Sequence, residues 1–226
     1  MPPFHPRLAD LPREVAVFPL SGALLLPQGR LPLNIFEPRY LAMTMDSLAN
    51  GRMFGMVQAD ARAPKGPTGP GLYRIGCLGR LSSFSETEDG RLLITLTGLL
   101  RFRIAEELPL APGGYRRIRA DYGEFAADLV VPEAGEETPP AVDRAELLGA
   151  LRPYFRARGI EANWDAVEQT ADDMLVTTLS MVCPFDVPEK QALLEAPDCG
   201  ERARMLVALM RMGAAANASP PDGRPS

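Results

Sequence analysis

LPLNIFEPRYLAM (residues 31–43) changes from one secondary-structure pattern to another at its centre. Its first part, 31–36, alternates apolar and polar side chains, which is typical of a half-buried strand. Pro38 cannot continue a paired strand and suits the first turn of a helix, where its missing N–H needs no partner. From Arg39 the apolar spacing is helical, and the predicted helix ends at Gly51 and buries Leu41, Met45 and Leu48. The stretch therefore predicts a strand that leads directly into a helix.

The rest of the first half is also predicted to be β structure. Glu88-Asp89-Gly90 separates two apolar runs, and Asp-Gly in such a position is typical of a β-hairpin turn. Besides 31–36, short strands are predicted at 14–20, 52–59, 71–87, 91–98, 99–108 and 115–125. Such a series favours a small closed or half-closed barrel, because closure removes exposed sheet edges.

The second half is predicted to be helical, because its apolar residues recur at a spacing of roughly 3.6. Asp143, Asp186 and Asp198 each precede a glutamate by three residues, which is the spacing of a capping box. Asn163 is a fourth candidate cap, and Pro153 is expected to kink or interrupt the first helix. Helices are therefore predicted at 143–159, 163–182, 186–196 and 198–213.

A strand block followed by a helix block is typical of an α+β fold. The chain has 226 residues, enough for one large domain or two small ones. We expect an N-terminal extension (1–12), a β-barrel-like subdomain (13–125), a polar connection (126–142), a helical subdomain (143–213) and a disordered tail (214–226).

The composition indicates a globular protein, with 46% hydrophobic and 23% charged residues. The net charge of −5 argues against a general nucleic-acid binder, which needs a basic face to neutralise phosphates. Neither a membrane-spanning run nor a signal-peptide core is found, so we expect a cytoplasmic protein without membrane association. The cysteines are odd in number and form no CxxC pair, so neither a disulfide framework nor a metal site is expected.

Patterns that would indicate catalysis are also missing. The single histidine, His5, lies between prolines near the N-terminus, which disfavours a Ser-His or Cys-His device. The loop at 63–71 resembles a phosphate-binding loop only superficially, because Pro67 and Pro70 lack the N–H donors that such loops use. No Walker motif occurs, and paired carboxylates fall on predicted solvated faces. We therefore expect a protein that is not an enzyme and that has no cofactor.

Two rows of arginines are candidates for an electrostatic surface. Arg101 and Arg103 alternate with apolar residues on one predicted strand, and Arg117 and Arg119 do so on another. If these strands pair, the four guanidinium groups share a face of the sheet. A solvated face with acidic neighbours is the favoured interpretation, and a phosphate-binding patch is the alternative.

The longer stretch VFPLSGALLLPQGRLPLNIFEPRYLAM (17–43) resembles the opening of the N-terminal substrate-binding domain of ATP-dependent Lon proteases. GCLGRL (76–81) and LLITLTGLLRFRI (92–104) are similar to central strands of that domain. The resemblance extends over most of 13–210. Its FEPRY (36–40) and GCLGR (76–80) motifs are most similar to those of bacterial stand-alone members of the family. It implies a PUA-like pseudo-β-barrel of about six strands followed by a helical bundle.

In full Lon proteases this domain helps to recognise unfolded or tagged substrates and supports hexamer assembly, whereas the ATPase and the peptidase lie in later domains. The resemblance thus implies a non-catalytic module, lacking those two domains, that binds exposed hydrophobic or unfolded protein segments or a protein partner. A separate protease is a further candidate partner. The candidate partner-binding residues are Phe36, Glu37, Arg39, Tyr40 and Met43, although a structural role of this corner is favoured. The alternative is PUA-like RNA or nucleotide binding through Arg101, Arg103, Arg117 and Arg119.

Overall fold

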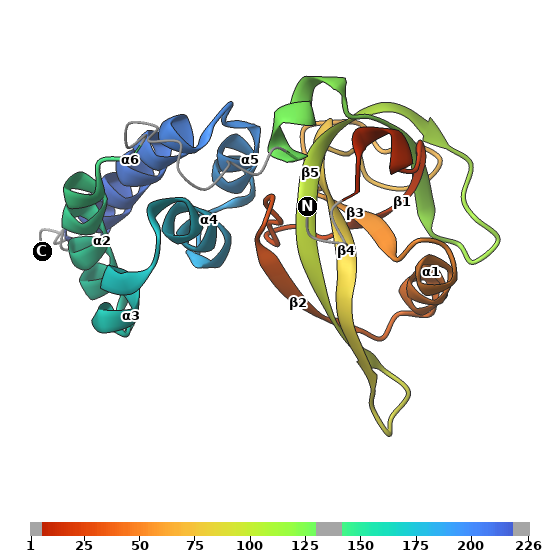
Figure 1. Ribbon diagram of the computed structural model, residues 1–226, viewed down its shortest axis with the longest axis horizontal. Coiled ribbons are helices and arrows are strands. Elements are labelled where there is room, and N and C mark those ends of the chain that lie inside the picture. Colours follow the sequence, from red (N-terminus) through yellow and green to blue (C-terminus); the bar gives the residue numbers. More distant parts are fainter. Residues whose placement is uncertain (1–5, 130–141, 219–226) are drawn as a thin grey trace, which may run out of the picture.

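The computed structural model describes residues 6–129 and 142–218, and it consists of a barrel beside a helical bundle (Figure 1). The strands of the barrel are β1 (Glu14–Pro19), β2 (Arg30–Ile35), β3 (Met53–Val57), β4 (Ile75–Glu86), β5 (Leu92–Leu108) and β6 (Arg116–Asp121). They follow the order β2-β5-β4-β3-β1-β6, and β5 also pairs with β6, so the sheet nearly closes on itself. This arrangement confirms the predicted α+β fold with an N-terminal pseudo-barrel.

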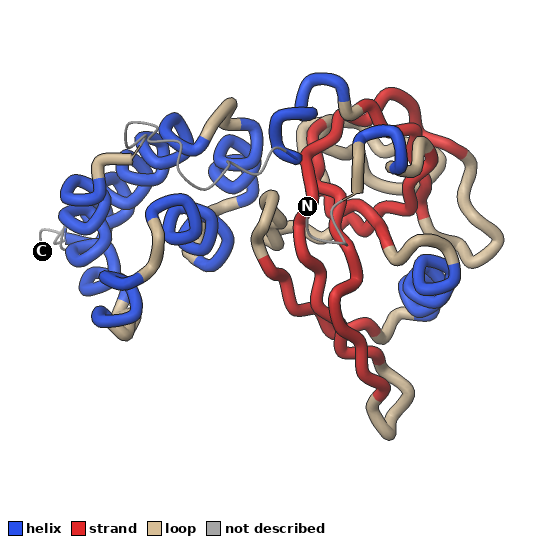
Figure 2. Tube along the Cα trace, in the orientation of Figure 1, coloured by secondary structure: helices blue, strands red, loops and turns tan. Residues whose placement is uncertain are grey.

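The longest strand, β5, replaces the two strands predicted at 91–98 and 99–108. It pairs with β2 and β4 in its first part and with β6 in its last part. Gly98 is not a turn residue: a Cβ at this position would lie 2.0 Å from the carbonyl oxygen of Leu26. The glycine therefore lets the β1–β2 loop approach the strand. The Asp-Gly hairpin between β4 and β5 is confirmed, with Gly90 at φ 79°, and it projects beyond the barrel (Figure 2).

Helix α1 (Pro38–Ala49) begins directly after β2, as the sequence predicts, with Pro38 in its first turn. Its buried face differs from the predicted one, because Met45 is 55% exposed and the buried residues are Tyr40, Met43, Thr44 and Ser47. The hydroxyl of Thr44 donates a hydrogen bond to the carbonyl of Tyr40, 2.8 Å away, so this polar residue is satisfied inside the core. The hydropathy pattern alone therefore predicts the wrong set of buried residues for α1.

The helical bundle contains α2 (Arg144–Arg158), α3 (Trp164–Gln169), α4 (Asp172–Val182), α5 (Val187–Glu195) and α6 (Cys199–Ala218). Two 3-10 helices, η1 (Leu8–Asp10) and η2 (Gly123–Leu129), lie against the barrel. All four predicted caps are confirmed, since each side chain accepts a hydrogen bond from the backbone N–H three residues on: Asp143, Asn163, Asp186 and Asp198. These local signals therefore set the helix starts.

Three helix predictions need correction. The helix predicted at 163–182 is two helices, separated at Thr170 and Ala171, whose backbones are extended. Pro153 lies inside α2 and does not interrupt it. Helix α6 continues past Gly213 into the predicted tail, because this glycine provides room for a neighbour rather than a helix end: a Cβ there would meet the ring of Tyr154 at 2.7 Å.

Some predictions fall outside the described residues, namely those on His5, most of the 126–142 connection and the last part of the tail. Within 6–129 and 142–218, no helix is both long and apolar enough to cross a membrane.

Candidate functional site

The corner between β2 and α1 holds the five candidate partner-binding residues, and packing accounts for two of them. Tyr40 is 6% exposed and lies 4.0 Å from the ring of Phe18, and Met43 is completely buried. Phe36 is 60% exposed, and Glu37 pairs with Arg39 at 2.9 Å. Tyr40 and Met43 therefore build the core. Partner binding by the three surface residues stays a prediction.

The structure separates the four arginines of the alternative basic face. Arg101 is 4% exposed and its guanidinium binds the carboxylate of Asp128 at 2.8 Å, so it belongs to no solvated face. The other three lie nearer the surface, and each has a carboxylate partner: Arg103 with Glu124, Arg117 with Glu14 and Arg119 with Glu106. These pairs offset the positive charge that phosphate binding would need.

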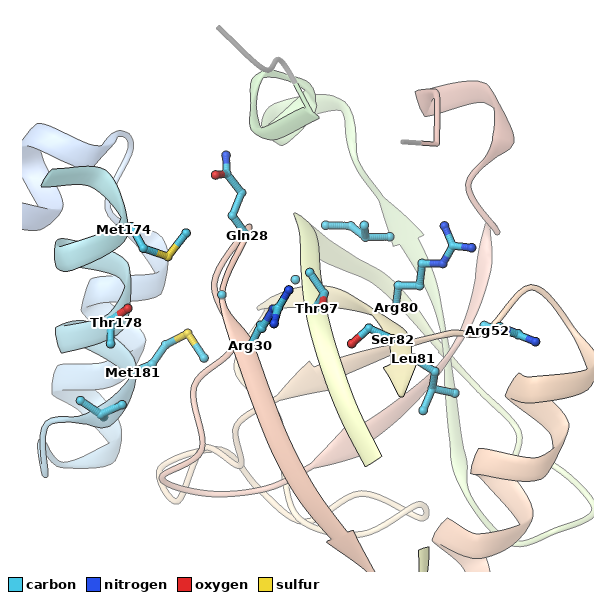
Figure 3. A pocket seen from close by; sticks show the side chains of 14 residues that line it. Gln28, Arg30, Arg52, Arg80, Leu81, Ser82, Thr97, Met174, Thr178 and Met181 are labelled. Atoms are coloured by element: carbon cyan, nitrogen blue, oxygen red, sulfur yellow. The ribbon is translucent and has the colours of Figure 1, made fainter. Parts of the chain in front are cut away.

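A cleft of about 1000 Å³ separates the barrel from helix α4 (Figure 3). One wall is α4, which presents Met174, Thr178, Met181 and Val182. The first three recur at helical spacing and therefore lie on one face of the helix, toward the barrel in Figure 3. Met174 is 39% exposed and Val182 is 65% exposed. Exposed apolar side chains that line a concave surface are typical of a binding groove.

The opposite wall comes from separate segments of the barrel. The loop before β2 and the first residue of β2 contribute 28–30, β4 contributes 80–82 and β5 contributes 97–99. Arg52, at the turn after α1, completes this wall. The side chains of Arg30, Arg52 and Arg80 are the charged groups of the lining.

Two residues with a strained backbone conformation line this cleft. In the described residues, the non-glycine residues with positive φ are Gln28 (65°) and Arg52 (61°), and both line the cleft. The left-handed conformation costs a non-glycine residue about 1–2 kcal/mol. Such strained residues cluster at functional sites, where the side chain has a use that glycine cannot supply. Because both strained residues line the cleft, we take the cleft as the candidate functional site.

Buried polar contacts hold the two walls together. The ammonium group of Lys190 donates to the carbonyl of Gly22 at 2.7 Å and to that of Met181 at 3.1 Å. The amide of Gln58 donates to the side chain of Gln191 at 3.2 Å, which itself donates to the carbonyl of Ile75. These bonds join α4 and α5 to the barrel. The cleft is therefore bounded by two subdomains fixed to one another.

The contact is close at the floor of the cleft. A Cβ on Gly29 would lie 2.3 Å from the sulfur of Met181, so α4 approaches the barrel closely at this point. Burial lowers the pKa of Lys190, and burial raises the pKa of the neighbouring Cys183 thiol to about 12. Lys190 contributes to the joint through its two hydrogen bonds.

The side chains that line the cleft are of three chemical kinds. Its lining combines methionines, hydroxyl groups and arginines. The part of the chain that the structure describes contains no group of three or more His, Cys, Asp or Glu side chains placed to hold a metal ion.

Sequence reasoning missed this cleft. Its residues come from five separate segments of the chain. No local pattern joins these segments, so no signal in the sequence pointed to the cleft.

The fold is a PUA-like pseudo-barrel followed by a helical bundle. Residues 14–212 match the model of the ATP-dependent protease La (LON) substrate-binding domain, so the chain belongs to this family. The resemblance seen in the sequence is thereby confirmed.

Curated relatives include Lon protease 2 of Myxococcus xanthus, 24% identical over 202 residues, and Lon protease 2 of Sorangium cellulosum, 26% identical over 199 residues. These alignments cover 89% and 87% of this chain but 24% of each relative. The chain thus spans about a quarter of the length of these relatives.

Two solved structures share the fold. One is a Lon N-terminal domain protein from Xanthomonas campestris, with a TM-score of 0.59 and 21% identity, covering 86% of this chain and 97% of that one. The other is the N-terminal domain of the Mycobacterium avium complex Lon protease, with a TM-score of 0.58 and 18% identity, covering 87% and 97%.

Proposed function

We propose that this protein is a non-catalytic module that binds exposed apolar segments of unfolded proteins or of a partner in the cleft between the barrel and α4. The observation that carries this proposal is the cleft itself: its lining includes both strained residues, Gln28 and Arg52, and the exposed methionine Met174. Methionine suits such a surface, because its flexible and polarisable side chain adapts to different apolar partners. The family name, a substrate-binding domain, supports the same function.

The proposal extends to proteolysis. The longer relatives are named Lon proteases, so a protease that receives the bound segment, in the same chain or as a separate partner, fits this role. RNA binding through the barrel is not favoured, because Arg101 is buried and the other three candidate arginines have carboxylate partners.

Binding of labelled, extended apolar peptides, measured by fluorescence anisotropy, tests the proposal. Met174→Glu should raise the Kd by about tenfold or more, because a carboxylate then has to be desolvated against apolar peptide side chains. Met212→Glu is the matched control, since Met212 is 59% exposed on α6 and outside the cleft. Phe36→Glu tests the corner between β2 and α1 in the same way, because Phe36 is 60% exposed there.

Loss of binding in Met174→Glu alone supports the cleft. Loss of binding in Phe36→Glu alone would move the site to the β2–α1 corner. Absence of binding to any apolar peptide at tens of micromolar would refute peptide recognition.

A further inference from the structure

Strand β2 has one edge without a partner strand. It pairs with β5 and lies at one end of the strand order, whereas β6, at the other end, also pairs with β5. Within 6–129 and 142–218, no strand adjoins the second edge of β2. Figure 1 shows β2 on the side of the barrel that faces the helical bundle. A free edge presents unpaired backbone N–H and C=O groups, which can pair with an added strand.

A bulge just before β2 determines which backbone groups point outward. Gln28 donates its N–H to the carbonyl of Gly98 at 2.9 Å, and Gly98 donates its N–H to the carbonyl of Gly29 at 2.9 Å. Two residues therefore oppose one, and Gln28 has a positive φ of 65°, the conformation of the first residue in one common kind of bulge. The carbonyl of Gly29 consequently points toward β5.

The alternation of an antiparallel ladder then identifies the outward groups. Every second residue after Gly29 also directs its backbone groups toward β5, so those of Arg30, Pro32 and Asn34 point away from it. The free edge offers three carbonyls and two N–H groups, because proline has no N–H. In the described part of the chain these five groups have no hydrogen-bond partner, and the three residues are exposed. The edge is thus open to an incoming strand.

Pro32 limits what can pair with this edge. If the β2 edges of two copies paired over these residues, each would supply two N–H donors, which gives four hydrogen bonds in total. A segment with a full set of N–H groups would supply three donors and accept two, which gives five. Proline at a sheet edge thereby disfavours pairing between copies. The edge is better suited to an extended segment of another protein than to a second copy.

The free edge begins at the cleft. Residues 28–30 belong to the cleft lining, and Met181 of α4 packs against Gly29. A strand added to β2 therefore has the apolar face of α4 beside one of its ends. We infer that an extended protein segment binds by adding a strand to the free edge of β2, held mainly by main-chain hydrogen bonds. Such binding accepts many sequences but excludes helices, whose N–H groups are already paired. This inference deepens the proposed function and rests on it.

Three forms of one short apolar peptide test this mode of binding by fluorescence anisotropy. The first is unmodified, the second carries N-methyl groups on its central residues, and the third is locked in a helix by a side-chain staple. The unmodified peptide should bind about tenfold or more tightly than either of the others. Methylation removes the donors that the outward carbonyls of β2 would accept, and a helix uses its donors internally.

Substitutions in β2 assign the effect to its free edge. Asn34→Pro removes an outward N–H and should raise the Kd about three- to tenfold, whereas the control Asn34→Ala keeps this N–H and should change the Kd less than about twofold. Pro32→Ala adds the missing N–H and should lower the Kd about three- to tenfold. Tighter binding cannot result from a damaged fold, so Pro32→Ala decides the question even if Asn34→Pro lowers the melting temperature.

The outcomes separate this inference from the proposed function. If the methylated peptide binds as tightly as the unmodified one, Pro32→Ala leaves the Kd unchanged and Met174→Glu raises it, the cleft binds side chains alone and the inference is overturned. If the wild type sediments as a dimer that Asn34→Pro converts to a monomer, a second copy occupies the edge and the inference is also overturned. If no peptide binds, the proposed function fails first, and the inference fails with it.

Discussion

The buried ion pair between Arg101 and Asp128 is expected to decide whether the barrel and the bundle unfold as one unit. The side chains are 5% and 11% exposed, and the guanidinium binds both carboxylate oxygens, at 2.9 and 2.8 Å. The same guanidinium donates to the carbonyl of Leu194 in the last turn of α5 and to those of Ala196 and Pro197 in the α5–α6 connection. Arg101 thereby joins β5, η2 and the bundle.

Asp128→Asn leaves the guanidinium buried without its counter-charge. Removal of one partner of a buried pair costs about 3–5 kcal/mol. The free energy of unfolding of a chain of this size falls by roughly 3 kcal/mol per molar urea, so the urea midpoint should fall by about 1–2 M.

The neighbouring pair between Arg103 and Glu124 provides a matched control. It connects the same two elements, β5 and η2, but its side chains are 47% and 55% exposed. Glu124→Gln should therefore cost at most about 1 kcal/mol.

Urea titrations with two probes provide the assay. The single tryptophan, Trp164, reports on the bundle, where its ring lies 6.0 Å from that of Phe155. Circular dichroism reports on both subdomains. The two transitions should coincide in the wild type and separate in Asp128→Asn. If Asp128→Asn costs no more than Glu124→Gln, the pair does not join the subdomains and the reasoning fails.

Other perturbations follow from single contacts. Gly98→Ala should cost about 1–3 kcal/mol because its Cβ meets the Leu26 carbonyl, whereas Gly149→Ala, with open space around it, should stabilise α2 by about 0.5–1 kcal/mol; equal melting temperatures would contradict this. Asp186→Ala should cost about 1 kcal/mol by removing the α5 cap, and an unchanged urea midpoint would refute that role. Burial and the hydrogen bond to Asp46 raise the pKa of Tyr115 from 10.0 to about 12. The folded state favours the protonated phenol. The stability that Tyr115 contributes to the fold is therefore complete below pH 10 and is lost as the pH rises toward 12. The urea midpoint of Tyr115→Phe should thus fall less steeply than that of the wild type between pH 10 and 12. An equal slope in both proteins would contradict the assignment of this pH dependence to Tyr115.

The sequence by itself determined the features that depend on neighbours along the chain. The strand-to-helix change at Pro38, the hairpin at Gly90 and the four helix caps all follow from local backbone requirements. The barrel followed from the succession of short strands and from the family resemblance. A local pattern can specify such features because all the interacting groups lie within a few residues of one another.

Only the tertiary structure decided which side chains are available for function. Arg101 and Arg103 are two residues apart on one strand and belong to the same alternating pattern, yet η2 and the α5–α6 connection cover only the first. The exposure of Met174 likewise depends on the break between α3 and α4 and on the way the bundle docks. The cleft exists because sheet closure and subdomain docking bring together segments far apart in the chain, and long-range packing of this kind leaves no local periodicity to detect.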